Sequence, residues 1–167
     1  CKVLENVKQT LFYKARDWIA GFFNALIYEE EQLATSRLLR YLYSTMSMFV
    51  SKDFKFDAAH NIVEYHGKCE SLHGHTYRLR VTLRGTPADD GMVLDFTILK
   101  KEVQEKVVAV LDHSYLNDII PQSTTENMAE WIWNKLELPL KGENYSLWEV
   151  VLWETDTSFV TLRRDER

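Results

Sequence analysis

The sequences DFKFDAAH at residues 53–60 and HGHTYRLRVTLR at residues 73–84 decide the fold class. In the first, phenylalanine, alanine and histidine alternate with aspartate and lysine. In the second, His73, His75 and a series of apolar residues alternate with threonines and arginines. Because side chains two residues apart on a strand point to the same face, each sequence predicts a strand with one buried and one polar face.

The sequence that follows these strands predicts two helices and then two more strands. Residues 96–111 carry apolar side chains at helical spacing, and residues 125–138 start at a Ser-Thr-Thr-Glu sequence typical of helix N-termini. Residues 144–155 and 159–164 are predicted strands joined by a short turn. The order β-β-α-α-β-β indicates a four-stranded antiparallel sheet with two helices on one face, an α+β fold. The apolar face of the first helix is predicted to comprise Ile98, Leu99, Val103, Val107, Val110 and Leu111.

Residues 1–47 are predicted to form a helical N-terminal extension, separate from a domain at residues 48–167. The extension lacks proline, and its apolar residues recur at steps of three and four. No combination of its residues suggests chemistry, so its expected role is packing or oligomer contact. Because the sequence begins with Cys1 rather than Met, three interpretations stay open: a fragment, a processed form, or an over-extended and non-native reading frame with Met46 or Met48 as the true start.

The composition excludes several classes of protein. The chain of 167 residues has a net charge of −5, which argues against nucleic acid as the main partner because phosphate binding requires a basic surface. No apolar run approaches the roughly 20 residues that span a bilayer, so no membrane partner is expected. The two cysteines, Cys1 and Cys69, cannot form a disulfide framework, which fits a reducing compartment. A cytoplasmic protein is therefore expected.

Three of the five histidines lie on the apolar faces of the first two predicted strands. They are His60, His73 and His75. Two adjacent antiparallel strands can bring the three imidazoles together, and three histidines with an open fourth position are typical of catalytic zinc. The alternative, three separately satisfied histidines, stays open at this point. The favoured interpretation is a Zn²⁺ site.

Other polar groups near this pattern are candidates for chemistry. Cys69 lies four residues before His73, where its thiol is interpreted as a base, a fourth zinc ligand or a small buried side chain. Asp112 and His113 follow the first predicted helix, as a proton relay or as a helix cap. Glu154 ends an otherwise apolar run, so it is expected to be paired, to bind a guanidine-like edge of a ligand, or to face solvent.

Six short sequences occur in a fixed order along the chain: Phe56-Asp-Ala-Ala-His60, Cys69-Glu-Ser-Leu-His73-Gly-His75, Gly91-Met-Val-Leu-Asp95-Phe96, Leu111-Asp-His113, Ser123-Thr-Thr-Glu-Asn127 and Trp153-Glu-Thr-Asp156. Together they resemble the family of 6-pyruvoyl-tetrahydropterin synthase and 6-carboxytetrahydropterin synthase. The resemblance covers about residues 48–164, essentially the whole chain apart from the extension. This order and spacing would be hard to obtain by chance.

The resemblance implies a tunnelling fold, in which three sheets close into a twelve-stranded barrel and two trimers stack as a hexamer. A homo-oligomer, either a trimer or a hexamer, is also expected because a lone four-stranded sheet leaves its edges unpaired. The implied cofactor is Zn²⁺, and its implied ligands are His60, His73 and His75. The implied substrate is 7,8-dihydroneopterin triphosphate, whose two side-chain hydroxyls would bind the zinc ion.

The resemblance also implies roles for the other polar residues. Cys69 would be the general base, and Asp112 with His113 would form the proton relay, within one chain or from a neighbouring subunit. Glu154 would anchor the pterin ring. Residues implied to lie near the ring are Thr124, Thr125 and Glu126.

The spacing of the cysteine bears on the product. Cys69 lies four residues before His73, as in the 6-carboxytetrahydropterin branch of queuosine biosynthesis, which also releases acetaldehyde. Glu70 lies three residues before His73, which resembles the variant branch that makes 6-hydroxymethyl-7,8-dihydropterin for folate. The carboxy product is the favoured interpretation. The hydroxymethyl product, with Glu70 as an alternative acid or base, the 6-pyruvoyl product and a non-catalytic zinc-binding protein stay open.

Overall fold

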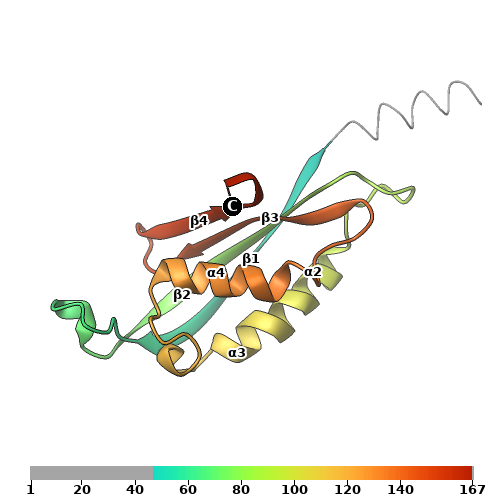
Figure 1. The fold of residues 1–167 in the computed structure, drawn as a ribbon. Coiled ribbons are helices and arrows are strands. Elements are labelled where there is room, and N and C mark those ends of the chain that lie inside the picture. Colours follow the sequence, from blue (N-terminus) through green and yellow to red (C-terminus); the bar gives the residue numbers. More distant parts are fainter. Residues whose placement is uncertain (1–46, 167) are drawn as a thin grey trace, which may run out of the picture. The chain divides into compact units, whose positions relative to one another are not determined.

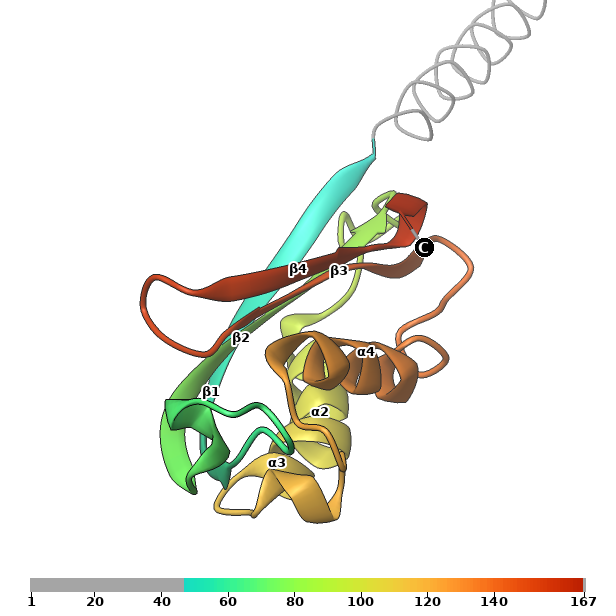
Figure 2. The ribbon, with the colours of Figure 1, turned by 60° about the vertical axis from the view of Figure 1, so that its left-hand side comes forward.

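The computed structural model describes residues 47–166, so the predicted helical extension lies outside the described residues except for Ser47. The four strands form one antiparallel sheet in the order β1-β2-β3-β4, and the helices pack on one of its faces (Figures 1 and 2). The strands are β1 (Met48–His60), β2 (His73–Gly85), β3 (Tyr145–Trp153) and β4 (Phe159–Arg163), and the helices are α2 (Phe96–Val103), α3 (Ala109–Leu111) and α4 (Thr125–Leu136). The predicted α+β architecture is confirmed.

The register of β1 and β2 aligns the predicted buried faces. His60 is the Cα partner of His73, and Ala58 is the partner of His75. The alternate residues of β1 from Phe54 to His60 are buried, as predicted from the period of two. The first strand begins at Met48 rather than near residue 53, because its first residues pair with the far end of β2 as far as Gly85.

The helical segment at residues 96–111 contains a π-helical turn, Gln104–Val108, between α2 and α3. The fully buried residues on this segment are Leu99, Val103, Val107 and Leu111. In an α-helix, two residues four positions apart point in directions that differ by about 40°. A π-helical turn is wider and offsets this difference, so buried residues spaced four apart remain on one face of the segment. The prediction that Ile98 and Val110 face the core is wrong, since they are 47% and 41% exposed.

The N-terminus of α4 is capped as the sequence predicts. The Oγ1 atom of Thr124 accepts a hydrogen bond of 3.3 Å from the backbone N–H of Asn127. On the sheet side of α4, Met128, Ile132 and Leu136 are fully buried, which fixes the helix against β3 and β4. No helix within residues 47–166 has the length and apolar content needed to cross a membrane.

A shortened protein of residues 48–167 is expected to fold and assemble without residues 1–47. The physical reason is that the apolar core cluster of the described residues, which runs from Phe54 to Leu152, is drawn from the sheet and the helices on it. Circular dichroism and size-exclusion chromatography against the full chain would check this expectation. An insoluble or unassembled shortened protein would show that the extension belongs to the core.

Candidate metal centre and active site

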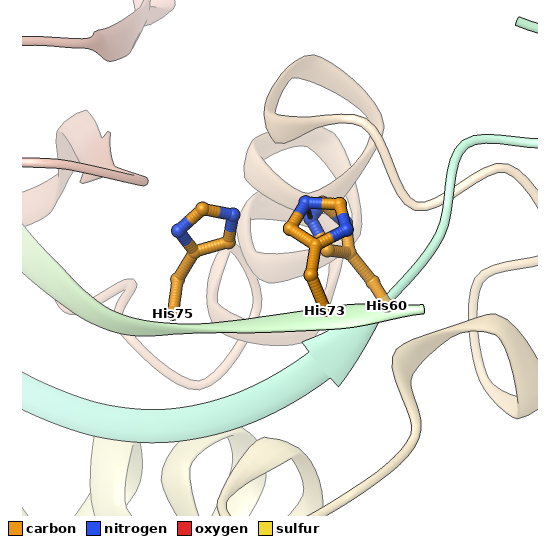
Figure 3. A group of neighbouring side chains, drawn as sticks. All are labelled: His60, His73 and His75. Atoms are coloured by element: carbon orange, nitrogen blue, oxygen red, sulfur yellow. Dashed lines mark hydrogen bonds between the residues drawn. The ribbon is translucent and has the colours of Figure 1, made fainter. Parts of the chain in front are cut away.

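Three imidazoles meet on the helix-covered face of the sheet, where β1 ends and β2 begins. His60, His73 and His75 rise from the same side of the two strands (Figure 3). One ligand atom from each lies within 4.8 Å of the other two, and the Nε2 atoms of His60 and His73 are 3.1 Å apart. Tetrahedral zinc with bonds of 2.0–2.1 Å would separate its nitrogen ligands by about 3.3 Å. The spacing of the three histidines therefore fits a metal ion.

Backbone carbonyl groups fix the tautomers of two of these rings. The Nδ1 atom of His60 is 2.9 Å from the carbonyl oxygen of Ser123, and that of His73 is 2.7 Å from the carbonyl oxygen of Ser71. A carbonyl oxygen only accepts hydrogen bonds, so each Nδ1 carries the proton and each Nε2 presents a lone pair. Two lone pairs that face each other at 3.1 Å repel unless a cation lies between them.

The third histidine is also poised as a ligand. Among the described residues, the Nε2 atom of His75 is buried without a hydrogen-bond partner. Burial lowers the pKa of His75, with His60 and His73 acting in the same direction and the carboxylate of Glu154 opposing them. Neutral imidazole is the form that binds metal ions. All three rings thus have a lone pair available, and together they can hold a metal ion.

Glu154 lies beside the histidines, just after the end of β3. Its Oε1 atom is 3.6 Å from His60 Nε2 and 4.0 Å from His75 Nε2, and its side chain is 29% exposed. The buried hydroxyl of Tyr77 belongs to the same surroundings, where burial and then the charge of Glu154 raise its pKa. A half-exposed carboxylate at the edge of the imidazole cluster is placed to meet a ligand that approaches from solvent.

The start of α4 is attached to the imidazole cluster through Ser123. Its carbonyl group binds His60, and the next residue, Thr124, caps the helix. Thr125 is buried and Glu126 is exposed, so the first turn of α4 offers a hydroxyl and a carboxylate.

The loop between β1 and β2 carries Cys69 and Glu70 in a short 3-10 turn, Lys68–Glu70. Both side chains are exposed, and the backbone of Cys69 is held by a 2.8 Å hydrogen bond from the N–H of Ile62. The Oε2 atom of Glu70 accepts a 3.1 Å hydrogen bond from the backbone N–H of His66. Among the described residues, the cluster of three histidines does not include the thiol, so its ligand atoms are three nitrogens.

The side chains of Asp112 and His113 are in contact beside β1. Their Oδ2 and Nδ1 atoms are 3.0 Å apart, and the Oδ1 atom of Asp112 accepts a 2.9 Å hydrogen bond from the N–H of Asp57. These hydrogen bonds, that from Asp57 foremost, lower the pKa of Asp112. His113 adopts a φ of 55°, a strained conformation of the kind found at functional sites. Within the described residues no contact joins this dyad to Cys69.

Comparison with known proteins identifies the family. The sequence model of 6-pyruvoyl tetrahydropterin synthase matches residues 49–165. This chain belongs to that family. The match covers β1 through β4, and therefore every candidate site residue described above lies within the matched region.

Relatives within and around the family carry more than one activity. The chain is 43% identical over 95 residues to a 6-carboxy-5,6,7,8-tetrahydropterin synthase of Synechocystis, covering 53% of this chain and 74% of the relative. It is 44% identical over 99 residues to a dihydroneopterin monophosphate aldolase of Pyrococcus furiosus, covering 56% of this chain and 82% of the relative. The 6-pyruvoyl tetrahydropterin synthase structure of Caenorhabditis elegans superposes with a TM-score of 0.66 at 28% identity, covering 73% and 99% of the two chains.

The tunnelling fold predicted for this pterin synthase family member is confirmed by that superposition. Sequence reasoning missed the carbonyl groups of Ser71 and Ser123 that orient His73 and His60. A backbone carbonyl is present at every residue, so no residue type in the sequence could have pointed to these two.

Proposed function

We propose that this protein is a zinc-dependent 6-carboxy-5,6,7,8-tetrahydropterin synthase. It converts 7,8-dihydroneopterin triphosphate and water to 6-carboxytetrahydropterin, acetaldehyde and triphosphate, a step of queuosine biosynthesis. The observation that carries the proposal is the meeting of three imidazoles with available lone pairs beside the half-exposed Glu154. The cysteine four residues before His73 and the Synechocystis relative favour the carboxy product.

The three histidines and Glu154 hold the two reacting partners. His60, His73 and His75 bind Zn²⁺, which when bound supplies Lewis-acid polarisation of the substrate hydroxyls. Glu154 accepts two N–H groups from the guanidine-like edge of the pterin ring, which places the ring next to the imidazole cluster. The first turn of α4 bounds this binding region, with Thr124, Thr125 and Glu126 as its polar groups.

Cys69 and the Asp112–His113 dyad carry out proton transfer. Cys69, exposed on the loop before His73, removes a proton from the substrate carbon next to the pterin ring. Because no contact joins Cys69 to the dyad within the described part of one chain, we assign the dyad to the cysteine of a neighbouring subunit. A hollow of about 450 Å³ beside His113, also lined by Asp57, Gly74 and Thr76, offers room for that approach. The active protein is then a homo-oligomer, a trimer or a hexamer.

A second candidate function is formation of 6-hydroxymethyl-7,8-dihydropterin. The relative named as a dihydroneopterin monophosphate aldolase favours it, as does the carboxylate of Glu70 next to Cys69. Against it, one oxygen of the Glu70 carboxylate accepts a hydrogen bond from the backbone N–H of His66 within its own loop, which holds the side chain toward that loop. The carboxy product therefore remains the main proposal.

Incubation of the zinc-loaded protein with 7,8-dihydroneopterin triphosphate, followed by mass spectrometry, tests the proposal. The expected products are 6-carboxytetrahydropterin and free triphosphate in equal amounts, with acetaldehyde detected separately. Heat-denatured protein with the same zinc concentration is the control for spontaneous decay. Hydroxymethyl-dihydropterin or 6-pyruvoyl-tetrahydropterin as the main product would contradict the carboxy assignment.

A further inference from the structure

The side-chain amide of Asn117 makes hydrogen bonds in four directions. Its Nδ2 atom donates to the carbonyl oxygens of Asn61 at 2.8 Å and of Pro121 at 3.1 Å. Its Oδ1 atom accepts from the backbone N–H of Asn61 at 3.1 Å and from the hydroxyl of Ser123 at 2.9 Å. Because carbonyl oxygens only accept, the group that faces Asn61 O and Pro121 O must be the NH₂ group. The orientation of the amide is therefore fixed by its neighbours.

The fixed amide determines where the proton of the Ser123 hydroxyl lies. Ser123 is fully buried, and its Oγ atom faces Oδ1 of Asn117, which only accepts, so the hydroxyl must donate to Asn117. The same oxygen lies 3.5 Å from Nδ1 of His60, with the Ser123 carbonyl oxygen at 2.9 Å from that nitrogen. The carbonyl oxygen and the Oγ atom of Ser123 can then only accept a hydrogen bond from His60 Nδ1. The proton of His60 is thereby held on Nδ1, and its lone pair stays on Nε2.

We propose that Asn117 is a positioning residue for His60 and hence for the metal centre. It acts on the imidazole through Ser123, and on the backbone through Asn61, the residue that follows His60. One amide thus restrains both the ring and the chain that carries it. This inference deepens the proposed function and rests on it, because its consequence for zinc affinity requires that the three histidines bind zinc.

Gln122 offers a matched control within the same chain. Its amide also holds the backbone of a single residue, since Oε1 accepts from the N–H of Val63 at 3.0 Å and Nε2 donates to the carbonyl oxygen of Val63 at 3.2 Å. Within the described residues, the hydrogen bonds of this side chain do not reach His60 or Ser123. Replacing Gln122 by alanine removes the same kind of contact from the same loop and leaves the tautomer of His60 unaffected.

The experiment compares Asn117→Ala, Gln122→Ala and the unaltered full chain by zinc competition against a chelator. Asn117→Ala is expected to weaken zinc affinity by about 10- to 100-fold, the usual range for groups that orient metal ligands, and Gln122→Ala to change it by less than about threefold. Long-range proton–nitrogen NMR of ¹⁵N-histidine in the metal-free proteins is expected to show His60 protonated on Nδ1 in the unaltered chain and in Gln122→Ala. A smaller Nδ1-protonated fraction is expected in Asn117→Ala, because Ser123, whose carbonyl group binds Nδ1, and Asn61 are no longer held in place. Equal zinc affinity in the two variants, with His60 unchanged, would overturn the proposal.

Two further outcomes are decisive. If Asn117→Ala does not fold, Ser123→Ala takes its place, because it removes only the hydroxyl between Asn117 and His60. Its zinc affinity is expected to be weaker than that of Gln122→Ala, and an equal affinity would overturn the action of Asn117 on the imidazole through Ser123. If the unaltered chain binds no zinc, the proposed metal centre fails. The protonation of His60 in the metal-free proteins then still decides whether Asn117 orients the ring.

Discussion

Replacing Cys69 by alanine is expected to reduce formation of the carboxy product by about 100-fold or more, the usual scale for a positioned acid–base group. The thiol lies exposed on the Lys68–Glu70 turn and is the proposed base, whereas the neighbouring carboxylate of Glu70 accepts a hydrogen bond from the N–H of His66. Zinc content is expected to stay unchanged, since the thiol is not part of the histidine cluster. Product formation is followed by mass spectrometry and zinc by elemental analysis.

The neighbouring Glu70→Gln variant is the matched control, because it alters the same turn and keeps the size of the side chain. It is expected to leave the carboxy product largely intact. If Glu70 is a second base, Cys69→Ala still releases some 6-hydroxymethyl-dihydropterin. Only the variant that combines Cys69→Ala with Glu70→Gln then forms no product. Undiminished carboxy product from Cys69→Ala would show that the base has been misassigned, and with it the choice between the two branches.

The variants His73→Ala and His75→Ala are each expected to lose the bound zinc and all activity. Each change removes one of three nitrogen ligands, and two imidazoles do not hold zinc in a site that needs at least three protein ligands. His66→Ala is the control, because that side chain is 86% exposed and lies outside the cluster. It is expected to retain the metal. Elemental analysis after dialysis measures the outcome, and zinc at full occupancy in both cluster variants would rule out the three-histidine site.

The local part of the structure could be predicted from the sequence because strand alternation depends only on neighbouring residues. A period of two placed His60, His73 and His75 on one buried face, and the register of β1 and β2 brings them together. The cap at Thr124 is likewise a short-range pattern. The exposure of Val110 could not be predicted, because the π-helical turn between α2 and α3, which comes before it, has no residue signature.

Contacts between residues far apart along the chain could not be predicted from the sequence. The carbonyl group of Ser123 lies 63 residues from His60 along the chain, and only folding brings the start of α4 to the end of β1. The same holds for the Asp112–His113 dyad, which the sequence places after a helix but not at the edge of β1, beside Asp57. The orienting groups of the candidate site therefore became visible only in three dimensions.

The most direct test of the three-histidine centre is X-ray diffraction from crystals of the unaltered protein, recorded on both sides of the zinc absorption edge. We expect one anomalous peak per chain, at roughly 2.0–2.1 Å from the Nε2 atoms of His60, His73 and His75, with the fourth position open to solvent. No peak at these atoms in zinc-loaded crystals, or a peak that also has the thiol of Cys69 as a ligand, would contradict an open catalytic metal centre in this protein.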